Sequence, residues 1–270
     1  MGVRRAAAAV ALTCGLAAAG CSAAGTETDV DVLGSWVLAS GSTPDGPLTV
    51  TRHTHVTLFF DDDGFGGTAP CNDYGSDYEV HGDSFAVTGD GISRTLMGCG
   101  EEPEALESAY LSALDDVGTV SRDGDTLMLT GDGVVLELRR EPLWPRARVV
   151  GRTWWVTSYT DDSGTTRRAT WRRGHRPFVR FDESSPNGGR FTTSNGCVTT
   201  RGRWREWHGA PAITRSAASG SCGVEPTRQE IALGSVIGEP VLELRGPAGR
   251  RVLVLRYAHA NSPAEVVYRR

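Results

Sequence analysis

The sequence has no lysine, so all 28 of its basic residues are arginines. This replacement is typical of proteins encoded by GC-rich genomes and by itself indicates no function. It does not explain how charge is distributed along the chain. Residues 22–143 carry 23 acidic residues and 5 arginines, a net charge of −18, whereas residues 144–270 carry 10 acidic residues and 21 arginines, a net charge of +11. We therefore hypothesise two units that lie against each other through opposite electrostatic fields.

The sequence also lacks a hydrophobic run of the roughly 20 residues that a membrane helix needs. A shorter apolar run, residues 6–16, follows Arg4 and Arg5 and ends in small residues before Cys21, a pattern typical of an export signal. The ending resembles a bacterial lipobox, although Ala18 stands where leucine is commonest. The resemblance implies a signal peptide over residues 1–20, a lipid on Cys21 that anchors the protein to the membrane, and a tether over 21–31. The alternative is an ordinary secretory signal cut nearby. We predict an exported lipoprotein of the cell membrane that faces the extracytoplasmic side.

Motifs of the common enzyme classes are missing. The chain contains no G-x-S-x-G, no P-loop, and no G-x-G-x-x-G that follows a strand and opens a helix. Acid pairs such as Asp115-Asp116 and Glu101-Glu102 are adjacent, so they lie on different faces of a helix instead of converging on a substrate. We predict a protein without enzymatic activity and without a cofactor.

Two short patterns resemble metal sites only in part. His53 and His55 alternate, which places both on one face of a strand, but no third ligand is identifiable. The run 61–64, Asp-Asp-Asp-Gly, lacks the alternating aspartates and distal glutamate of a calcium loop. An aspartate-rich β-turn explains this run better, and we predict no metal site.

The six cysteines are interpreted through the predicted compartment. Cys14 leaves with the signal and Cys21 is the lipid site, so four cysteines remain, Cys71, Cys99, Cys197 and Cys222. An even number of cysteines in an exported protein favours disulfides over metal sites or catalytic thiols. Four cysteines allow three pairings.

An internal repeat chooses among these pairings. Residues 34–40 are answered by 153–158, 56–67 by 178–191, 92–95 by 213–216, and 99–107 by 222–230, in the same order. A unit that duplicates carries its bridge with it, which predicts Cys71–Cys99 and Cys197–Cys222. Short β-rich runs separated by glycine and aspartate turns predict mostly antiparallel sheet. Apolar residues at helical spacing after Cys99 predict one helix per unit, weaker in the second copy because of Gly234.

The first unit resembles the META domain of HslJ-like envelope proteins. The resemblance rests on the tryptophan strand at 34–40, the glycine turn into Cys71-Asn72 with its following tyrosines, and Thr95-Leu96-Met97-Gly98-Cys99. It implies an α+β fold of two tandem small domains, each a mostly antiparallel curled β-sheet packed with one α-helix and closed by one disulfide. The predicted divisions are domain 1 at 32–140, a linker at 141–149, a degenerate domain 2 at 150–257, and a C-terminal tail at 258–270. The degenerate copy has Val198 where Asn72 would stand.

The resemblance implies a protein of the bacterial envelope with a role in stress or antibiotic tolerance, and it implies no enzymatic mechanism. We predict a non-enzymatic binding module; the alternatives are an envelope hydrolase or ligand-binding protein with a polar site in domain 1, and a structural spacer. The possible binding residues are Asn72, Tyr74, Arg167, Arg168, Arg172 and Arg173. The arginines lie in an aromatic-containing stretch, 167–180. Its expected partners are anionic lipid head groups, a teichoic-type anionic polymer, the acidic first unit or an envelope protein. Nucleic acid is not an expected partner, because the protein is predicted to be exported. The competing interpretation of this stretch is a solvated loop. The sequence does not indicate the oligomeric state.

Overall fold

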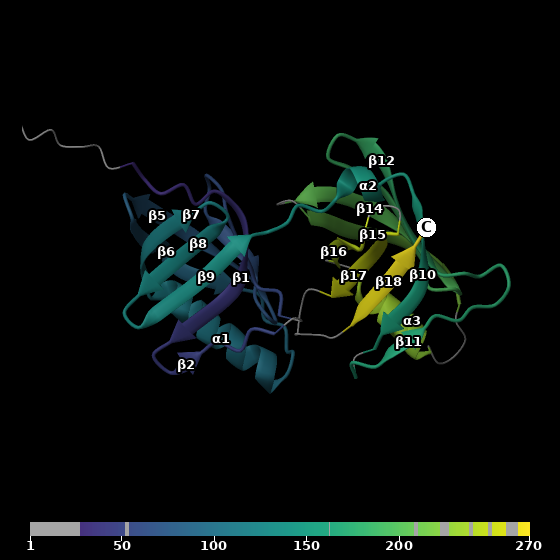
Figure 1. Cartoon of the computed structure of the whole chain (residues 1–270), viewed down its shortest axis with the longest axis horizontal. Coiled ribbons are helices and arrows are strands. Elements are labelled where there is room, and N and C mark those ends of the chain that lie inside the picture. Colours follow the sequence, from purple (N-terminus) through teal and green to yellow (C-terminus); the bar gives the residue numbers. More distant parts are fainter. Residues whose placement is uncertain are drawn as a thin grey trace, which may run out of the picture.

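The chain folds into two β-sheet units that lie side by side in the computed structural model (Figure 1). The structure describes residues 28–51, 54–161, 163–207, 210–221, 227–237, 240–247, 250–257 and 264–270. The predicted signal peptide and Cys21 lie outside these residues. Among the described helices, none combines the length and the apolar composition needed to cross a bilayer.

The first unit is a closed antiparallel sheet. The strands follow the order β2-β1-β3-β4-β5-β6-β7-β8-β9, and β9 also pairs with β1, which closes the ring. The bounds are β1 Gly34–Thr43, β2 Gly46–Pro47, β3 Thr57–Phe60, β4 Phe65–Thr68, β5 Asp73–His81, β6 Ser84–Arg94, β7 Val117–Asp123, β8 Thr126–Gly131 and β9 Val134–Arg140. Closure leaves no free edge over most of this sheet, which limits strand pairing with other chains.

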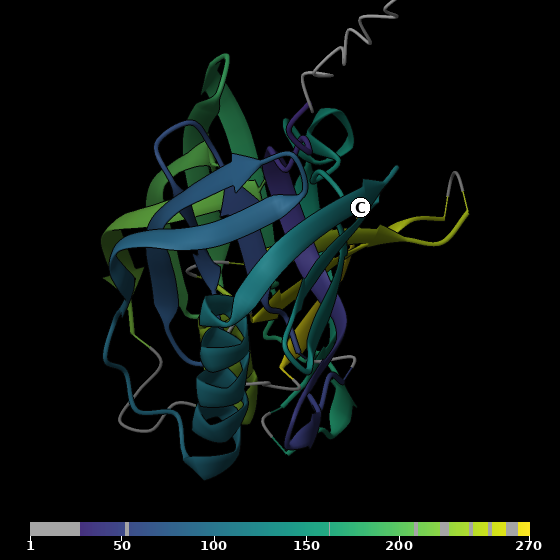
Figure 2. The same cartoon turned by 90° about the vertical axis from the view of Figure 1, so that its left-hand side faces the viewer.

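One helix, α1 (Glu101–Asp115), packs against this sheet, as the helical spacing predicts (Figure 2). Its first turn carries three acids, which interact favourably with the positive end of the helix dipole. Tyr110 and Leu114 are fully buried and join Trp36, Leu58 and the other inward-facing strand residues in one core. The alternation of buried and half-buried residues along β3 and β8 follows from the period of two of a strand with one face in the core.

The second unit is a similar sheet with a shorter helix. Its strands follow the order β15-β14-β13-β12-β10-β18-β17-β16, and β11 pairs with β10. The bounds are α2 Arg146–Val149, β10 Thr153–Thr160, β11 Thr166–Arg168, β12 Phe178–Ser185, β13 Gly188–Ser194, β14 Val198–Trp207, β15 Ala210–Gly220, α3 Arg228–Ser235, β16 Pro240–Arg245, β17 Val252–Tyr257 and β18 Glu265–Arg269. The predicted fold class, two mostly antiparallel sheet domains with few helices, is confirmed.

The registers of the two units correspond. Trp36 pairs with Leu58 and Trp154 with Val179, and each first strand has a register shift two to four residues after its tryptophan. Both tryptophans are fully buried, and each indole Nε1 donates to a backbone carbonyl just upstream, that of Val32 at 2.8 Å or Val149 at 3.1 Å. The aligned tryptophans of the repeat thus have the same structural role.

The second unit extends beyond the predicted boundaries at both ends. Trp144 and Val149, in the predicted linker, are buried in the core of the second unit. Residues 265–269, in the predicted tail, form β18, which lies between β10 and β17. Val266 and Tyr268 are buried on its inner face, so the C-terminal strand completes the sheet.

Candidate functional sites

A buried carboxylate stands at the centre of the disulfide region in the first unit. Cys71 and Cys99 are joined, with their Cα atoms 5.7 Å apart, as the repeat predicts. Glu107 of α1 is 1% exposed, and its Oε2 accepts hydrogen bonds from the backbone N–H groups of Cys71 at 3.0 Å and Asn72 at 2.7 Å. Its Oε1 accepts from Asn72 Nδ2 at 2.8 Å and from Arg94 Nη1 at 3.1 Å. We call Cys71, Asn72, Arg94 and Glu107 the Glu107 cluster. Four donors compensate the cost of burying this charge.

The side chain of Asn72 is bonded inside the protein at both of its polar atoms. Its Oδ1 accepts from Met97 N at 2.6 Å and Thr95 Oγ1 at 2.9 Å, while its Nδ2 donates to Glu107. These bonds fix the segment that leads to Cys99, in which Leu96 is 89% exposed. The observed role of Asn72 is to hold this segment against the disulfide.

Tyr74 is likewise bonded inside the core. Its hydroxyl donates to the carbonyl of Thr57 at 2.7 Å and lies 2.6 Å from the hydroxyl of Tyr110. Burial raises the pKa of Tyr74 well above its usual value, and the neighbouring Tyr110 raises this pKa further. Both tyrosines are therefore neutral hydrogen-bonding groups that join β5 to α1.

The second unit supports the corresponding turn in a different way. The backbone N–H groups of Cys197 and Val198 donate to Oδ1 of Asn195, at 3.1 and 2.8 Å, and not to a helix carboxylate. Glu230, which aligns with Glu107, forms a capping box with Thr227 at the start of α3, and its Oε1 lies 3.0 Å from Cys197 Sγ. Cys197 is disulfide-bonded, but its predicted partner Cys222 lies outside the described residues, so that pairing stays a prediction.

The residues that resembled metal ligands form turns and pairs. Asp61 Oδ1 accepts from the N–H groups of Asp63 at 3.0 Å and Gly64 at 3.1 Å, the geometry of an aspartate turn. His55 Nε2 lies 3.5 Å from Glu141, and His53 is outside the described residues. Within the described part of the chain, no group of three histidine, cysteine or acidic side chains is arranged to hold a metal ion.

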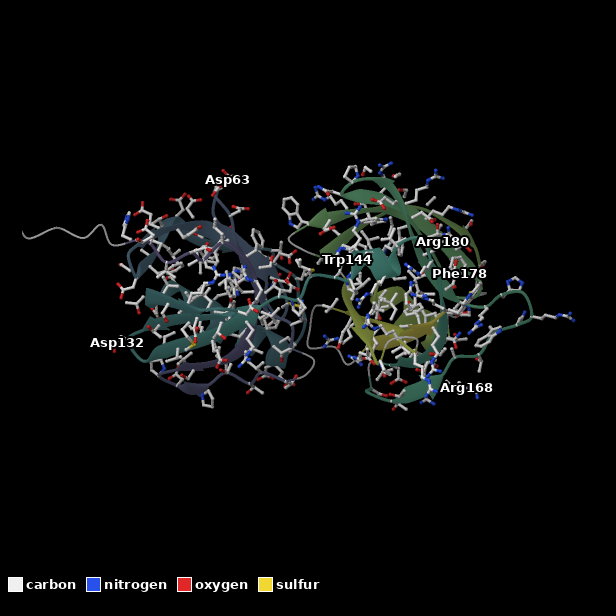
Figure 3. The ribbon with its side chains drawn as sticks, turned by 45° about the horizontal axis from the view of Figure 1, so that its top comes forward. Asp63, Asp132, Trp144, Arg168, Phe178 and Arg180 are labelled. Carbon is white, nitrogen blue, oxygen red and sulfur yellow. A yellow bond between two sulfur atoms is a disulfide. The ribbon has the colours of Figure 1, made fainter. Side chains whose placement is uncertain are left out.

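The predicted arginines lie together on a surface segment of the second unit, residues 166–176, which we call the arginine loop. Arg167, Arg168, Arg172 and Arg173 are all exposed, and Trp171 is 44% exposed. Figure 3 shows Arg168 at the edge of this unit and pointing to solvent. Arg167 Nε donates to Asp161 at 3.3 Å, whereas the other three make no ion pair with any described residue. All four cations are thus exposed on one short surface segment.

Specific contacts hold the arginine loop against the second unit. The side chain of Gln229 in α3 accepts from Thr170 N and donates to Thr170 O, both at 2.8 Å. The guanidinium of Arg176 lies 4.9 Å from the ring centre of Trp171 and 5.4 Å from that of Trp155, within cation–π range. The loop therefore presents its arginines from a supported backbone.

Sequence reasoning missed several residues that organise these sites, namely Arg94, Glu107, Tyr110, Asn195 and Gln229. Glu107 could have been found, because the spacing of the predicted helix places it on the same face as the apolar residues that form the core. Asn195 gives no such signal, since asparagine beside glycine indicates only a turn.

A family model matches the first unit, and two solved structures are similar to part of the chain. Residues 30–142 match the model of the META domain. An NMR structure of a protein from Burkholderia xenovorans is 24% identical, with a TM-score of 0.35, and the match covers 40% of this chain and 81% of that one. A second NMR structure is 18% identical, with a TM-score of 0.31, and covers 40% of this chain and 89% of the other. No match was found among curated proteins. The first unit, which contains the Glu107 cluster and the Cys71–Cys99 disulfide, is a META domain.

Proposed function

We propose that this protein is a non-enzymatic binding module of the cell envelope, anchored by a lipid on Cys21, whose arginine loop binds an anionic envelope polymer. The observation that carries the proposal is the exposed group of Arg167, Arg168, Arg172 and Arg173 around an exposed tryptophan. Arginine forms paired hydrogen bonds with phosphate groups, and tryptophan adds contact area for the polymer backbone.

The two units contribute differently to this function. The first unit carries most of the acidic residues, and Asn72 and Tyr74 are engaged in its own structure, which leaves recognition of an anion to the second unit. We propose that the second unit is a diverged META domain, because its register and its buried first-strand tryptophan parallel those of the first. On this view, sequence divergence of the second unit after duplication produced the basic surface that recognises the polymer.

The test compares retention on immobilised poly(glycerol phosphate), a polymer of the teichoic type. Replacement of Arg167, Arg168, Arg172 and Arg173 by serine is expected to weaken retention by tenfold or more, since each arginine near an anionic surface contributes on the order of 1 kcal/mol. The matched control replaces Arg148, Arg190, Arg203 and Arg269, which are also exposed, and so removes the same charge elsewhere on this unit. Equal losses in both variants would contradict a specific site and indicate attraction by net charge alone.

The anchor has its own test. Metabolic labelling with a fatty acid should mark the wild-type protein and not the Cys21→Ser variant, and the variant should leave the membrane fraction. Labelled Cys21→Ser protein, or a variant still held at the membrane, would contradict the lipid anchor.

A further inference from the structure

A groove of about 740 Å³ lies between the two units and is lined by both. Its first wall is the outer face of the META domain, where Val37 and Phe59 lie. Its second wall is formed by Trp144, Trp207 and the segment 210–212. Binding sites for small molecules commonly lie at domain interfaces and have volumes of roughly 300–1,000 Å³, so the groove has a suitable place and size.

Two glycines of β4 allow close packing behind the first wall. A Cβ atom at Gly66 would lie 2.9 Å from Cζ of Phe59, so the ring lies across this glycine. A Cβ atom at Gly67 would lie 1.9 Å from the carbonyl oxygen of Thr57, closer than any real contact. Gly66 therefore lets the Phe59 ring lie against the sheet, and Gly67 lets β4 lie close to β3.

The second wall is formed largely by tryptophans. Trp207 is 50% exposed, an unusual state for so large an apolar side chain, and the guanidinium of Arg205 lies 4.6 Å from its ring centre. Trp144 is only 5% exposed, and Figure 3 places it on the side of the second unit that faces the first. Its buried Nε1 has no hydrogen-bond partner among the described residues. An unpaired buried N–H is unfavourable, so a hydrogen-bond acceptor brought to this wall would be stabilised.

Two ion pairs lie at the groove, whose lining also includes Asp73, Arg139 and Arg140. His55 Nε2 lies 3.5 Å from Glu141, and Arg256 Nη2 lies 3.9 Å from Glu243. A charged ligand would have to compete with these pairs, whereas an uncharged one would leave them intact. Aromatic rings on both walls favour a flat ligand that contacts ring faces.

We propose that this groove binds one flat, uncharged, aromatic or polycyclic small molecule that carries a hydrogen-bond acceptor. Phe59 and Trp207 contact its ring system from the two units, and Trp144 Nε1 donates to its acceptor once the indole, which packs edge-on against Phe181 and Trp204, turns toward the groove. The site goes beyond the polymer-binding function, because it shares no residue with the arginine loop.

The experiment uses the full chain and the dye Nile red, which is uncharged, flat and has a carbonyl acceptor. We expect saturable binding of one dye molecule per chain, read from the dye's fluorescence. Phe59→Ser and Trp207→Ser should each raise the Kd by about tenfold or more, since each removes an aromatic contact on one wall. Trp171→Ser is the matched control for the second, because Trp171 is similarly exposed but lies outside the groove, and it should leave the Kd unchanged.

A variant that fills the groove provides an independent test if Phe59→Ser is poorly folded. Ala212→Trp adds bulk inside the groove without removing a contact and should abolish dye binding while the circular dichroism spectrum stays native. Absence of saturable binding, more than one dye per chain, or an effect confined to one wall would each overturn the proposal. The serine variant of the four arginines should bind Nile red normally, so the outcomes for the groove and for the arginine loop are separable.

Discussion

At the scale of single residues, the hydroxyls of Tyr74 and Tyr110 have unequal roles despite their mutual contact. Tyr74 donates to the Thr57 carbonyl, so Tyr110 is the donor in the bond between the two hydroxyls. Tyr110→Phe removes one bond and leaves the donor of Tyr74 satisfied, at a cost of about 1 kcal/mol. Tyr74→Phe leaves both the Thr57 carbonyl and the Tyr110 hydroxyl buried without a partner, at a cost of about 2–4 kcal/mol.

The measurement is chemical unfolding of each variant followed by far-ultraviolet circular dichroism. Tyr78→Phe is the control, since the Tyr78 hydroxyl donates a single bond of 3.1 Å to the Asp61 carbonyl. Equal destabilisation by Tyr74→Phe and Tyr110→Phe would show that Thr57 gains another partner, such as water, when Tyr74 is changed.

Asp161 makes the stability of the second unit depend on pH in the acidic range. The hydroxyl of Ser163, with further bonds from Thr165 N and Arg167, lowers the pKa of Asp161 to about 2. A carboxylate whose pKa is lower in the folded state than in the unfolded chain stabilises the fold above the unfolded pKa of about 4, and this stabilisation is lost as pH falls toward 2. We expect Asp161→Asn to lower the Tm at pH 6, and the difference from wild type to shrink between about pH 4 and pH 2.

Tryptophan fluorescence suits this measurement, because six of the seven tryptophans follow residue 143 and so report on the second unit. Asp132→Asn is the control, since Asp132 is an exposed turn residue of the first unit. A wild-type-to-variant difference that stays constant from pH 6 to pH 2 would contradict the role given to Asp161.

At the scale of elements, the two units support equivalent turns in two different ways. In the first unit the turn at Cys71-Asn72 depends on Glu107 of α1, whereas in the second the turn at Cys197-Val198 depends on the local Asn195. Glu107→Gln brings an NH₂ group toward buried donors, and we expect a local cost of about 2–3 kcal/mol. Glu230→Gln should leave the backbone bonds of the second turn unchanged, because Asn195 still accepts both N–H groups and Glu230 contacts only the sulfur of Cys197.

Hydrogen exchange measured by mass spectrometry can follow both turns in the same molecule. Glu107→Gln should speed exchange in peptides containing Cys71 by about 30-fold or more, as a cost of this size implies. Glu101→Gln is the control on the same helix, since Glu101 is exposed in its first turn. A comparable acceleration around Cys197 in Glu230→Gln would mean that the helix also supports the second turn.

The elements were more predictable from the sequence than the contacts between them. The helix at 101–115 follows from apolar spacing, and the Cys71–Cys99 bridge follows from the repeat. The strand at 265–269 was missed because a pattern of five alternating residues at a chain end is too short to distinguish a strand from an irregular tail. In the Glu107 cluster, Glu107 and Cys71 are 36 positions apart in the sequence. Such residues become neighbours only through the tertiary fold, which the sequence pattern does not specify. The groove was beyond prediction because its walls are the outward faces of two units, and outward residues leave no hydrophobic period.

At the scale of the whole molecule, the net charges of −18 and +11 give the two units opposite fields, and Figure 3 shows arginine nitrogens around the second unit. Attraction between separated surface charges is screened at about 10 Å in 0.1 M salt and about 3 Å in 1 M salt. If this attraction holds the units together, small-angle X-ray scattering should give a compact particle in dilute buffer and a larger radius of gyration in about 1 M sodium chloride.

Nile red binding should weaken over the same range of salt concentration, because the groove needs both walls. The Ala212→Trp variant should show the same expansion but bind no dye. A radius of gyration that does not change with salt would show that contacts other than charge fix the two units, and dye binding would then be insensitive to salt as well.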